Sequence, residues 1–191
     1  MPREIEIKLR IPSAPAMRDT LAHHGYSVHH AREKEINLVF DSPAVRLIEH
    51  GQLLRLRRIG TRTILTYKGP AENAKHRSRE EIEFTLQDGD ALEIILDRLG
   101  FSSIFRYEKF RTEYKRPGEE GIVTVDETPI GDFIELEGPP AWIDETAHQL
   151  GFRDSDFVTE SYGALYRRHR EITPGAPRDM VFLESSLHPI E

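Results

Sequence analysis

The sequence predicts an α+β fold in which strands with one charged and one apolar face are combined with helices. Charged and apolar residues alternate over residues 4–9, which is the side-chain period of a β-strand. Similar glutamate pairs recur at residues 81–86 and 135–137, and each pair precedes a helix-like stretch that ends in glycine and an aromatic residue. Glycine is favoured just beyond a helix end because it adopts the left-handed conformation without steric cost. Three unequally spaced units indicate a pseudo-repeated domain rather than a solenoid.

The elements follow from these patterns in chain order. Helices are expected at residues 13–26, 88–101, 140–152 and 155–170. Further alternating strands are expected at residues 51–57, 62–68, 109–114 and 121–126, with a weaker one at 37–41. The polar composition of residues 71–78 predicts a mobile loop, and Trp142 is expected to pack the third helix against the strands. We expect a single domain over residues 1–172 and a flexible tail over residues 173–191, where prolines interrupt any periodicity.

Composition narrows the class of protein. A chain of 191 residues fits one domain with a full core. Its net charge of −7 disfavours sequence-independent binding to nucleic acid. No stretch reaches the roughly 20 apolar residues of a membrane helix, and the first strand begins too early for a signal peptide. Without cysteine there is no disulfide or thiolate metal site. We therefore expect a cytoplasmic protein with no nucleic-acid or membrane partner, and a homodimer stays open.

One face of the expected strands collects charges of both signs. The acidic set is Glu4, Glu6, Glu81, Glu83, Asp126, Glu135 and Glu137, and the basic set is Lys8, Arg55, Arg57, Lys68, Arg79, Lys109 and Arg111. An antiparallel sheet could turn this face to water. Alternatively, the sheet could close into a barrel with a polar interior and helices outside. The intervening helices and short strands disfavour a membrane barrel with the same alternation.

A barrel interior that carries both positive and negative side chains can bind phosphate groups together with divalent metal ions. Arginine grips phosphate oxygens bidentately and lysine acts as a point charge. Clustered carboxylates hold Mg²⁺ or Mn²⁺, although Mg²⁺ usually takes only one or two of them. Some of the seven carboxylates in the acidic set must therefore pair with basic groups or hold a second ion. The absence of a GxxxxGK[ST] motif excludes a P-loop enzyme.

The ordered motifs resemble the CYTH superfamily of triphosphate tunnel metalloenzymes over roughly residues 1–170. The resemblance begins with the ExExK pattern of Glu4, Glu6 and Lys8 at the N-terminus. It continues through the motifs that contain Leu54–Arg57, Leu65–Pro70, Arg79–Glu83, Lys109–Arg111, Val125–Glu127 and Gly131–Glu137. This resemblance implies a closed antiparallel eight-stranded β-barrel with helices packed outside, which binds a small-molecule triphosphate together with Mg²⁺ or Mn²⁺.

The same resemblance implies roles for individual residues. The metal ligands would be Glu4, Glu6, Asp126, Glu135 and Glu137. The phosphates would be bound by Lys8, Arg55, Arg57, Lys68, Arg79, Lys109 and Arg111. Catalysis would depend on Glu4, Glu6, Lys8 and Glu81, with Glu81 at the metal or orienting water. Arg79 and Glu83 could instead form only an ion pair in the lumen.

Two features lie outside this pattern. Members of the superfamily often carry a basic residue where this chain has Glu160, before Ser161 and Tyr162. Arg167 or Arg168 is a candidate replacement for that charge. Histidines 23, 24, 29 and 30 are expected to be solvated, in a helix end and the following loop, because no partner stands at catalytic spacing.

Three functions remain open from the sequence. The first is hydrolysis of an inorganic or organic triphosphate, such as tripolyphosphate, thiamine triphosphate or a nucleoside triphosphate. The second is the class IV adenylate cyclase reaction, in which ATP gives cyclic AMP and pyrophosphate. The third is a non-catalytic polyphosphate or nucleotide sensor, which would need the basic set but not the acidic one. We weight hydrolysis slightly above cyclisation because it demands fewer features.

Overall fold

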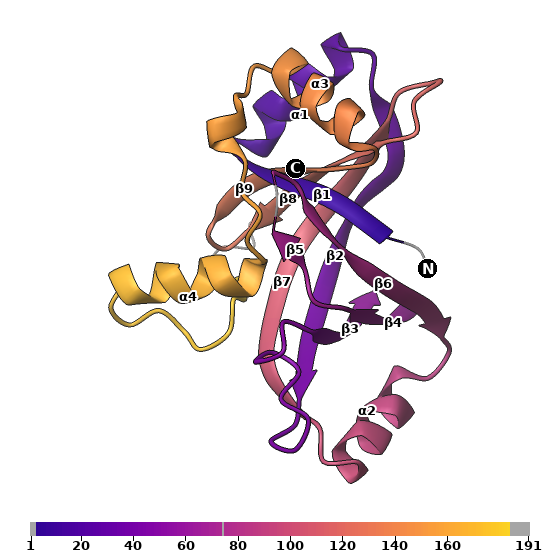
Figure 1. Ribbon diagram of the computed structural model, residues 1–191, viewed down its shortest axis with the longest axis vertical. Helices are drawn as coiled ribbons and strands as arrows, with labels where there is room; N and C mark the ends of the chain where they lie inside the picture. The colour runs from indigo at the N-terminus through magenta and orange to yellow at the C-terminus, as the bar shows by residue number, and fades with distance from the viewer. Residues whose placement is uncertain (1–2, 74, 184–191) are drawn as a thin grey trace.

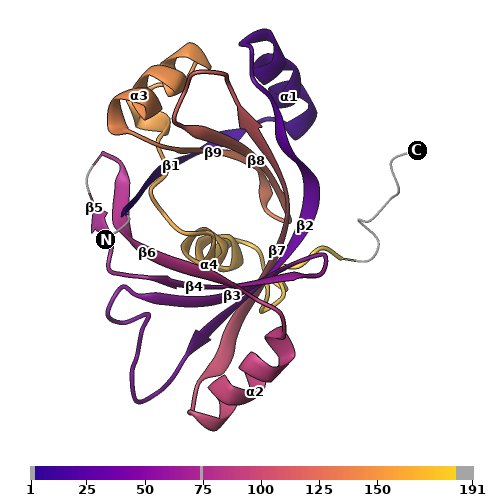
Figure 2. The same cartoon turned by 90° about the vertical axis from the view of Figure 1, so that its right-hand side faces the viewer.

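The protein is a closed antiparallel β-barrel, seen in a computed structural model that describes residues 3–73 and 75–183 (Figure 1). Its strands are β1 (Arg3–Ile11), β2 (Ser27–Asp41), β3 (Leu53–Ile59), β4 (Arg62–Lys68), β6 (Arg77–Leu86), β7 (Ser102–Lys115), β8 (Ile122–Thr128) and β9 (Gly131–Glu137). The order β1-β9-β8-β7-β2-β3-β4-β6 closes where β6 pairs with β1. The two-residue strand β5 (Glu72–Asn73) adds to the edge of β6. The ring is visible end-on in Figure 2 and confirms the predicted eight-stranded barrel.

The barrel turns its apolar side outwards. Alternate residues of β1, among them Ile7 and Leu9, are fully buried beneath α1 (Ala14–His23) and α3 (Pro140–Gln149). Ser13 caps α1 by accepting a hydrogen bond from the Ala16 N–H at 3.4 Å. A second cluster joins α2 (Gly89–Arg98) to the barrel through Leu96, Leu56 and Phe40. Polar residues are thereby left for the interior of the barrel, as the closed arrangement requires.

Trp142 fixes α3 to the barrel, as the sequence predicts. Its ring lies so close to Gly121 that a Cβ atom there would stand 2.3 Å from the ring, so only glycine fits. The indole N–H donates to Glu119 Oε2 at 2.9 Å.

The last helix, α4 (Tyr162–Ile172), crosses one end of the barrel (Figures 1 and 2). It begins later than the sequence predicts, because residues before it are extended and Val158 pairs with Lys8 of β1 through two 2.9 Å backbone hydrogen bonds. A short 3₁₀ turn (Asp154–Asp156) precedes this segment. Ser161 then caps the helix by accepting from the Ala164 N–H at 3.3 Å.

The expectation of a flexible tail is wrong for residues 174–183. Met180 is fully buried, and its backbone accepts a 2.8 Å hydrogen bond from the Glu108 N–H. The ring of Phe182 lies 5.2 Å from that of Phe110. Apolar side chains thus hold this segment against β7 although its sequence has no periodicity. The rest of the expected tail, residues 184–191, lies outside the described residues.

Two further expectations need correction. The weak strand at residues 37–41 is the end of the 15-residue strand β2, so His29 and His30 lie on a strand and not in a loop, although both are exposed as expected. The expected mobile loop at 71–78 contains β5 and the start of β6, and Lys75 pairs with Asp144 and Asp154 at 2.9 Å each. In the described part of the chain, no helix has the length and hydropathy to cross a bilayer.

Candidate active site

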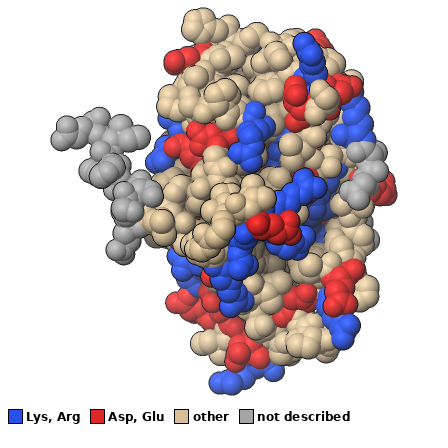
Figure 3. Space-filling model, turned by 90° about the vertical axis from the view of Figure 1, so that its left-hand side faces the viewer, with Lys and Arg blue, Asp and Glu red and all other residues tan. Residues whose placement is uncertain are grey.

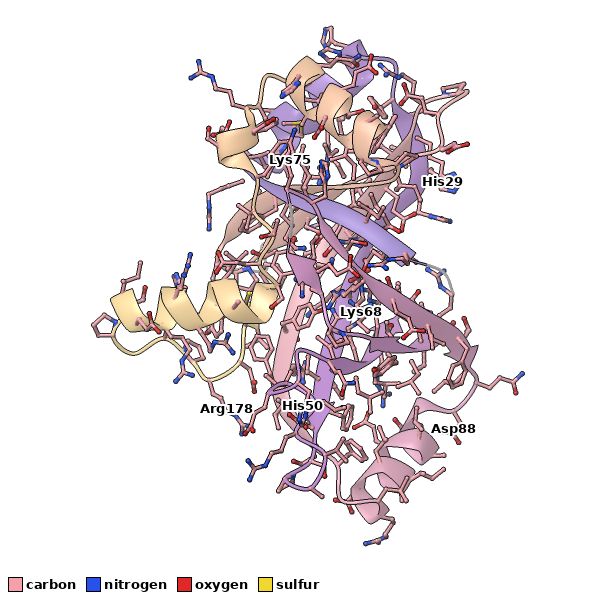
Figure 4. The ribbon with its side chains drawn as sticks, in the orientation of Figure 1. His29, His50, Lys68, Lys75, Asp88 and Arg178 are labelled. Carbon is pink, nitrogen blue, oxygen red and sulfur yellow. The ribbon has the colours of Figure 1, made fainter. Side chains whose placement is uncertain are left out.

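The interior of the barrel holds a cavity of about 600 Å³ lined by charged side chains. Among the described residues, eleven lysines and arginines and seven glutamates line it, although the whole chain has a net charge of −7. Of the fourteen charged residues predicted to share one strand face, thirteen line this cavity and only Asp126 does not. Lys68 lies inside the barrel in Figure 4, and lysine and arginine side chains surround α4 at the barrel end in Figure 3.

Ion pairs connect β1 with its neighbours around this lumen. Lys68 Nζ lies 2.7 Å from both carboxylate oxygens of Glu4, and Arg79 Nε lies 3.3 Å from one of them. Lys8 Nζ stands 3.2 Å from Glu6 and 3.2 Å from Glu135. Burial alone would raise the pKa of Glu4, but Lys68 and Arg79 outweigh it and lower the pKa to about 2.

Two other lumen carboxyls, those of Glu81 and Glu137, have raised rather than lowered pKa values. Burial and the charge of Glu4 raise the pKa of Glu81 to about 7, against the effect of Lys68. Burial and the charges of Glu4 and Glu6 raise the pKa of Glu137 to about 7. Like charges crowd here beyond what the neighbouring cations neutralise, and a divalent cation would relieve that crowding. The oxygen-only donor set of Glu4, Glu6 and Glu137 therefore fits Mg²⁺ or Mn²⁺.

The carboxylates of the lumen are too far apart to coordinate one ion together in this conformation. No three carboxylates of the described lumen residues bring ligand oxygens within 4.8 Å of one another. Five of the seven lumen glutamates, Glu4, Glu6, Glu81, Glu83 and Glu135, pair instead with a lysine or arginine. Binding of an ion would therefore require these side chains to exchange a cationic partner for the metal.

Asp126 stands apart from the other predicted metal ligands. It is completely buried, and its oxygens accept from Lys109 at 2.8 Å, from Arg111 at 2.7 and 2.6 Å and from the Tyr162 hydroxyl at 2.7 Å. These donors occupy both oxygens and separate Asp126 from the lumen. The structure thus places Asp126 behind the basic residues, where it positions Lys109 and Arg111 rather than facing an ion in the cavity.

Comparison with known proteins agrees with the barrel fold. The family model described as the CYTH domain matches residues 2–161. The chain belongs to the CYTH family. A curated relative, "Putative adenylate cyclase MJ0240" of Methanocaldococcus jannaschii, is 29% identical over 134 residues, which cover 70% of this chain and 75% of the relative.

Solved structures share the same CYTH fold. The PH1819 protein of Pyrococcus horikoshii is 27% identical with a TM-score of 0.72, and the match covers 87% of this chain and 99% of that one. A Vibrio parahaemolyticus protein matches with a TM-score of 0.73 over 86% of this chain and 97% of its own. At 20% identity, the second match shows the fold alone.

The CYTH lumen contains an arginine that the sequence analysis missed. Arg77 lines the cavity, pairs with no described carboxylate, and its buried Nε has no hydrogen-bond partner. Burial and the neighbouring charge of Arg79 lower the pKa of Arg77. Arg77 was missed because residues 71–78 were expected to form a loop. The two-residue period of Arg79, Glu81 and Glu83 nevertheless extends back to Arg77 and could have identified it. Its Nη1 donates to the Thr159 carbonyl oxygen at 3.3 Å, and no ion pair with a described carboxylate occupies the rest of the guanidinium, which suits an anionic ligand.

Two more buried groups were also missed. Glu35 of β2 lies 3.4 Å from Arg57 and 3.6 Å from Lys109, and these cations lower its pKa although burial opposes them. Tyr107 accepts a hydrogen bond from Arg55 at 3.3 Å. The sequence around Glu35 alternates too weakly to have marked it as a residue buried inside the barrel.

The structure also distinguishes between Arg167 and Arg168, the two candidates to replace the basic residue that is absent before Ser161 and Tyr162. Arg168 pairs with Glu160 at 3.0 Å on the surface of α4. Arg167 instead lines the cavity, together with Arg170 and Arg178. Arg167 is therefore the candidate that can supply a positive charge at this end of the barrel.

The raised pKa values predict how the stability of the metal-free CYTH barrel depends on pH. Glu81 and Glu137 keep their protons in the folded state up to about pH 7, whereas the ordinary value is 4.5. The folded state then binds more protons between these limits, so the free energy of unfolding should fall as pH rises from about 5 to about 7. Urea unfolding in EDTA across this range measures the slope.

Variants identify the groups responsible for that slope. Glu81→Gln and Glu137→Gln should each flatten it, because the amide does not titrate. Glu49→Gln is the control, since Glu49 lies on the surface beside Arg46. A slope that is equal in all four proteins would contradict the assignment.

Proposed function

We propose that this CYTH protein is a divalent-metal-dependent enzyme that hydrolyses a triphosphate bound along the lumen. One observation carries the proposal, namely the excess of cationic over anionic side chains in a cavity of an otherwise acidic chain. A polyanion is the ligand that such a cavity attracts. The carboxylates whose pKa values are raised indicate that a cation accompanies it.

The basic residues would bind and orient the phosphates. Arg55, Arg57, Arg77 and Arg111 offer guanidinium groups from β3, β6 and β7, and Lys68 adds a point charge from β4. Glu4, Glu6 and Glu137 would hold Mg²⁺ or Mn²⁺, which when bound neutralises phosphate charge. In phosphoryl transfer such positioning and neutralisation supply most of the catalysis.

Glu81 is the candidate general base. Without metal its pKa is about 7, and a cation held by Glu4 would lower that value, so Glu81 would be ionised and able to accept a proton at neutral pH. Water would attack a phosphorus atom, the bond from that phosphorus to the bridging oxygen would break, and the proton of the water would pass to Glu81. Lys8 and Arg79 would stabilise the charge on the departing phosphate.

Cyclisation of ATP is the second candidate. The curated relative that carries the name of an adenylate cyclase supports it, as does the apolar part of the cavity wall, formed by Leu53, Ile104, Phe105 and Tyr107. Such a surface can contact an organic group attached to the triphosphate. A binding module without catalysis would need no crowded acidic group, so the raised pKa values count against it.

One assay separates the three functions. The protein is incubated with Mg²⁺ or Mn²⁺ and either ATP, tripolyphosphate or thiamine triphosphate, and the products are separated by chromatography. Released phosphate supports hydrolysis, and cyclic AMP with pyrophosphate supports cyclisation. Binding without any product would overturn both enzymatic proposals.

Arg57→Ala tests the phosphate grip. The side chain of Arg57 reaches the cavity while its Nε donates to Asn37 Oδ1 at 3.0 Å. Loss of a charge-assisted contact of about 1.5–3 kcal/mol should raise KM by about 10- to 100-fold. Steady-state kinetics measure it, with Arg62→Ala as control because Arg62 pairs with Glu33 on the surface. An unchanged KM would remove Arg57 from the substrate site.

A further inference from the structure

A cluster of two histidines and a glutamate lies outside the acidic group described above. It consists of His29 and His30 of β2 and Glu113 of β7. His30 Nδ1 is 2.5 Å from Glu113 Oε2, and the ring centroids of His29 and His30 are 4.4 Å apart. Each residue offers one ligand atom to a set in which all atoms lie within 4.8 Å of one another.

An irregular strand brings the two histidines together. Consecutive residues of a regular strand point to opposite faces. The pairing of β2 with β7 shifts its register between Val28 and His30 and again between His30 and Glu33. These bulges break the alternation, so that both imidazoles reach the same carboxylate.

Glu113 connects this cluster with the lumen. It lines the cavity two residues beyond Arg111 on β7. In the described part of the chain, most lumen glutamates pair with lysine or arginine, whereas His30 is the one basic group that pairs with Glu113. Figure 4 shows His29 on the side of the barrel away from α4. The cluster thus lies on the side of the barrel that α4 leaves uncovered, with one ligand reaching the cavity.

We propose that His29, His30 and Glu113 form a binding site for a divalent transition-metal ion such as Zn²⁺. Two imidazoles and a carboxylate are ligands for zinc and similar borderline ions rather than for Mg²⁺. Ligand atoms about 2.0–2.2 Å from zinc lie within about 4.4 Å of one another, so only small rotations of these side chains are needed. The exposed faces of His29 and His30 leave the remaining coordination positions to water.

Calorimetric titration of the full chain with Zn²⁺, in an excess of Mg²⁺ that occupies the lumen carboxylates, tests the site. His30→Ala and Glu113→Gln should each weaken the tightest Zn²⁺ binding by at least about tenfold, as expected for loss of a ligand. His148→Ala is the matched control, because His148 is equally exposed and also pairs with one carboxylate, Asp154, at 2.9 Å. It should bind Zn²⁺ as the unchanged protein does.

A second measurement identifies the ligands directly. With one equivalent of Cu²⁺, electron paramagnetic resonance should show nitrogen hyperfine coupling, which His29→Ala and His30→Ala each reduce. Equal Zn²⁺ affinity in the unchanged protein and in His30→Ala would overturn the site, as would an equal loss in His148→Ala. Neither readout depends on catalysis, so the outcome is independent of the proposed hydrolysis.

Discussion

Asp126→Asn is expected to destabilise the protein more than any other single substitution of a charged residue inside the barrel. The carboxylate is completely buried and neutralises Lys109 and Arg111 at once. Removing its charge leaves two buried cations without this partner, a loss that typically costs about 3–5 kcal/mol. That is a large share of the total stability of a domain, which is about 5–15 kcal/mol. Urea unfolding in EDTA measures the change.

Its neighbour in sequence provides the control. Glu127 pairs with Arg18 and with Arg32, the latter at 2.9 Å, at the partly exposed outer surface of the barrel. Glu127→Gln should cost about 1 kcal/mol or less, as surface pairs generally do. A similar loss of stability in both variants would show that complete burial adds nothing to the contribution of Asp126.

Glu6→Gln is expected to have the largest effect on activity. Glu6 is buried, and among the described residues only Lys8 pairs with it, so one carboxylate oxygen stays free for a cation. The amide keeps the shape of the side chain but loses the charge that, under the proposed function, would hold Mg²⁺ or Mn²⁺. The metal concentration for half-maximal activity should rise by at least about 10- to 100-fold, and kcat should fall with it. Phosphate release at several metal concentrations measures both.

Glu127→Gln again serves as the control, since it changes a glutamate outside the lumen. Thermal unfolding of Glu6→Gln should show that the fold persists. Unchanged metal dependence in a folded Glu6→Gln protein would refute the ligand assignment.

Alternation of side chains was sufficient to predict most of the strands, whereas their closure into an eight-stranded barrel was implied by the family resemblance. The regular strands β1, β3, β4 and β9 pack one apolar face against other elements, so their two-residue period is visible in the sequence. The first half of β2 was missed because residues 27–33 are exposed on both faces and their pairing with β7 is irregular. Only contacts distant in sequence hold that segment in the sheet, and a local pattern does not record them.

The site was predictable as a set of residues but not as a set of partners. The period of two identified thirteen charged residues that line the cavity, since every second side chain of a barrel strand faces inwards. It could not distinguish Asp126, which is enclosed by three donor residues, from Glu137, which lies among other carboxylates. That distinction depends on the register between β7, β8 and β9. The burial of Met180 likewise depends on a contact with β7.

The seam that closes the barrel is short and is built from the same residues as the candidate site. The antiparallel ladder between β1 and β6 has four residue pairs, which run from Arg3 opposite Glu80 to Glu6 opposite Arg77. Glu4 and Arg79 face each other in this ladder and also form an ion pair across it. A ligand in the lumen that contacts both β1 and β6 would therefore help to keep the barrel closed. Its binding would raise the free energy of unfolding by about 2.7 kcal/mol when the free ligand concentration is a hundred times the dissociation constant.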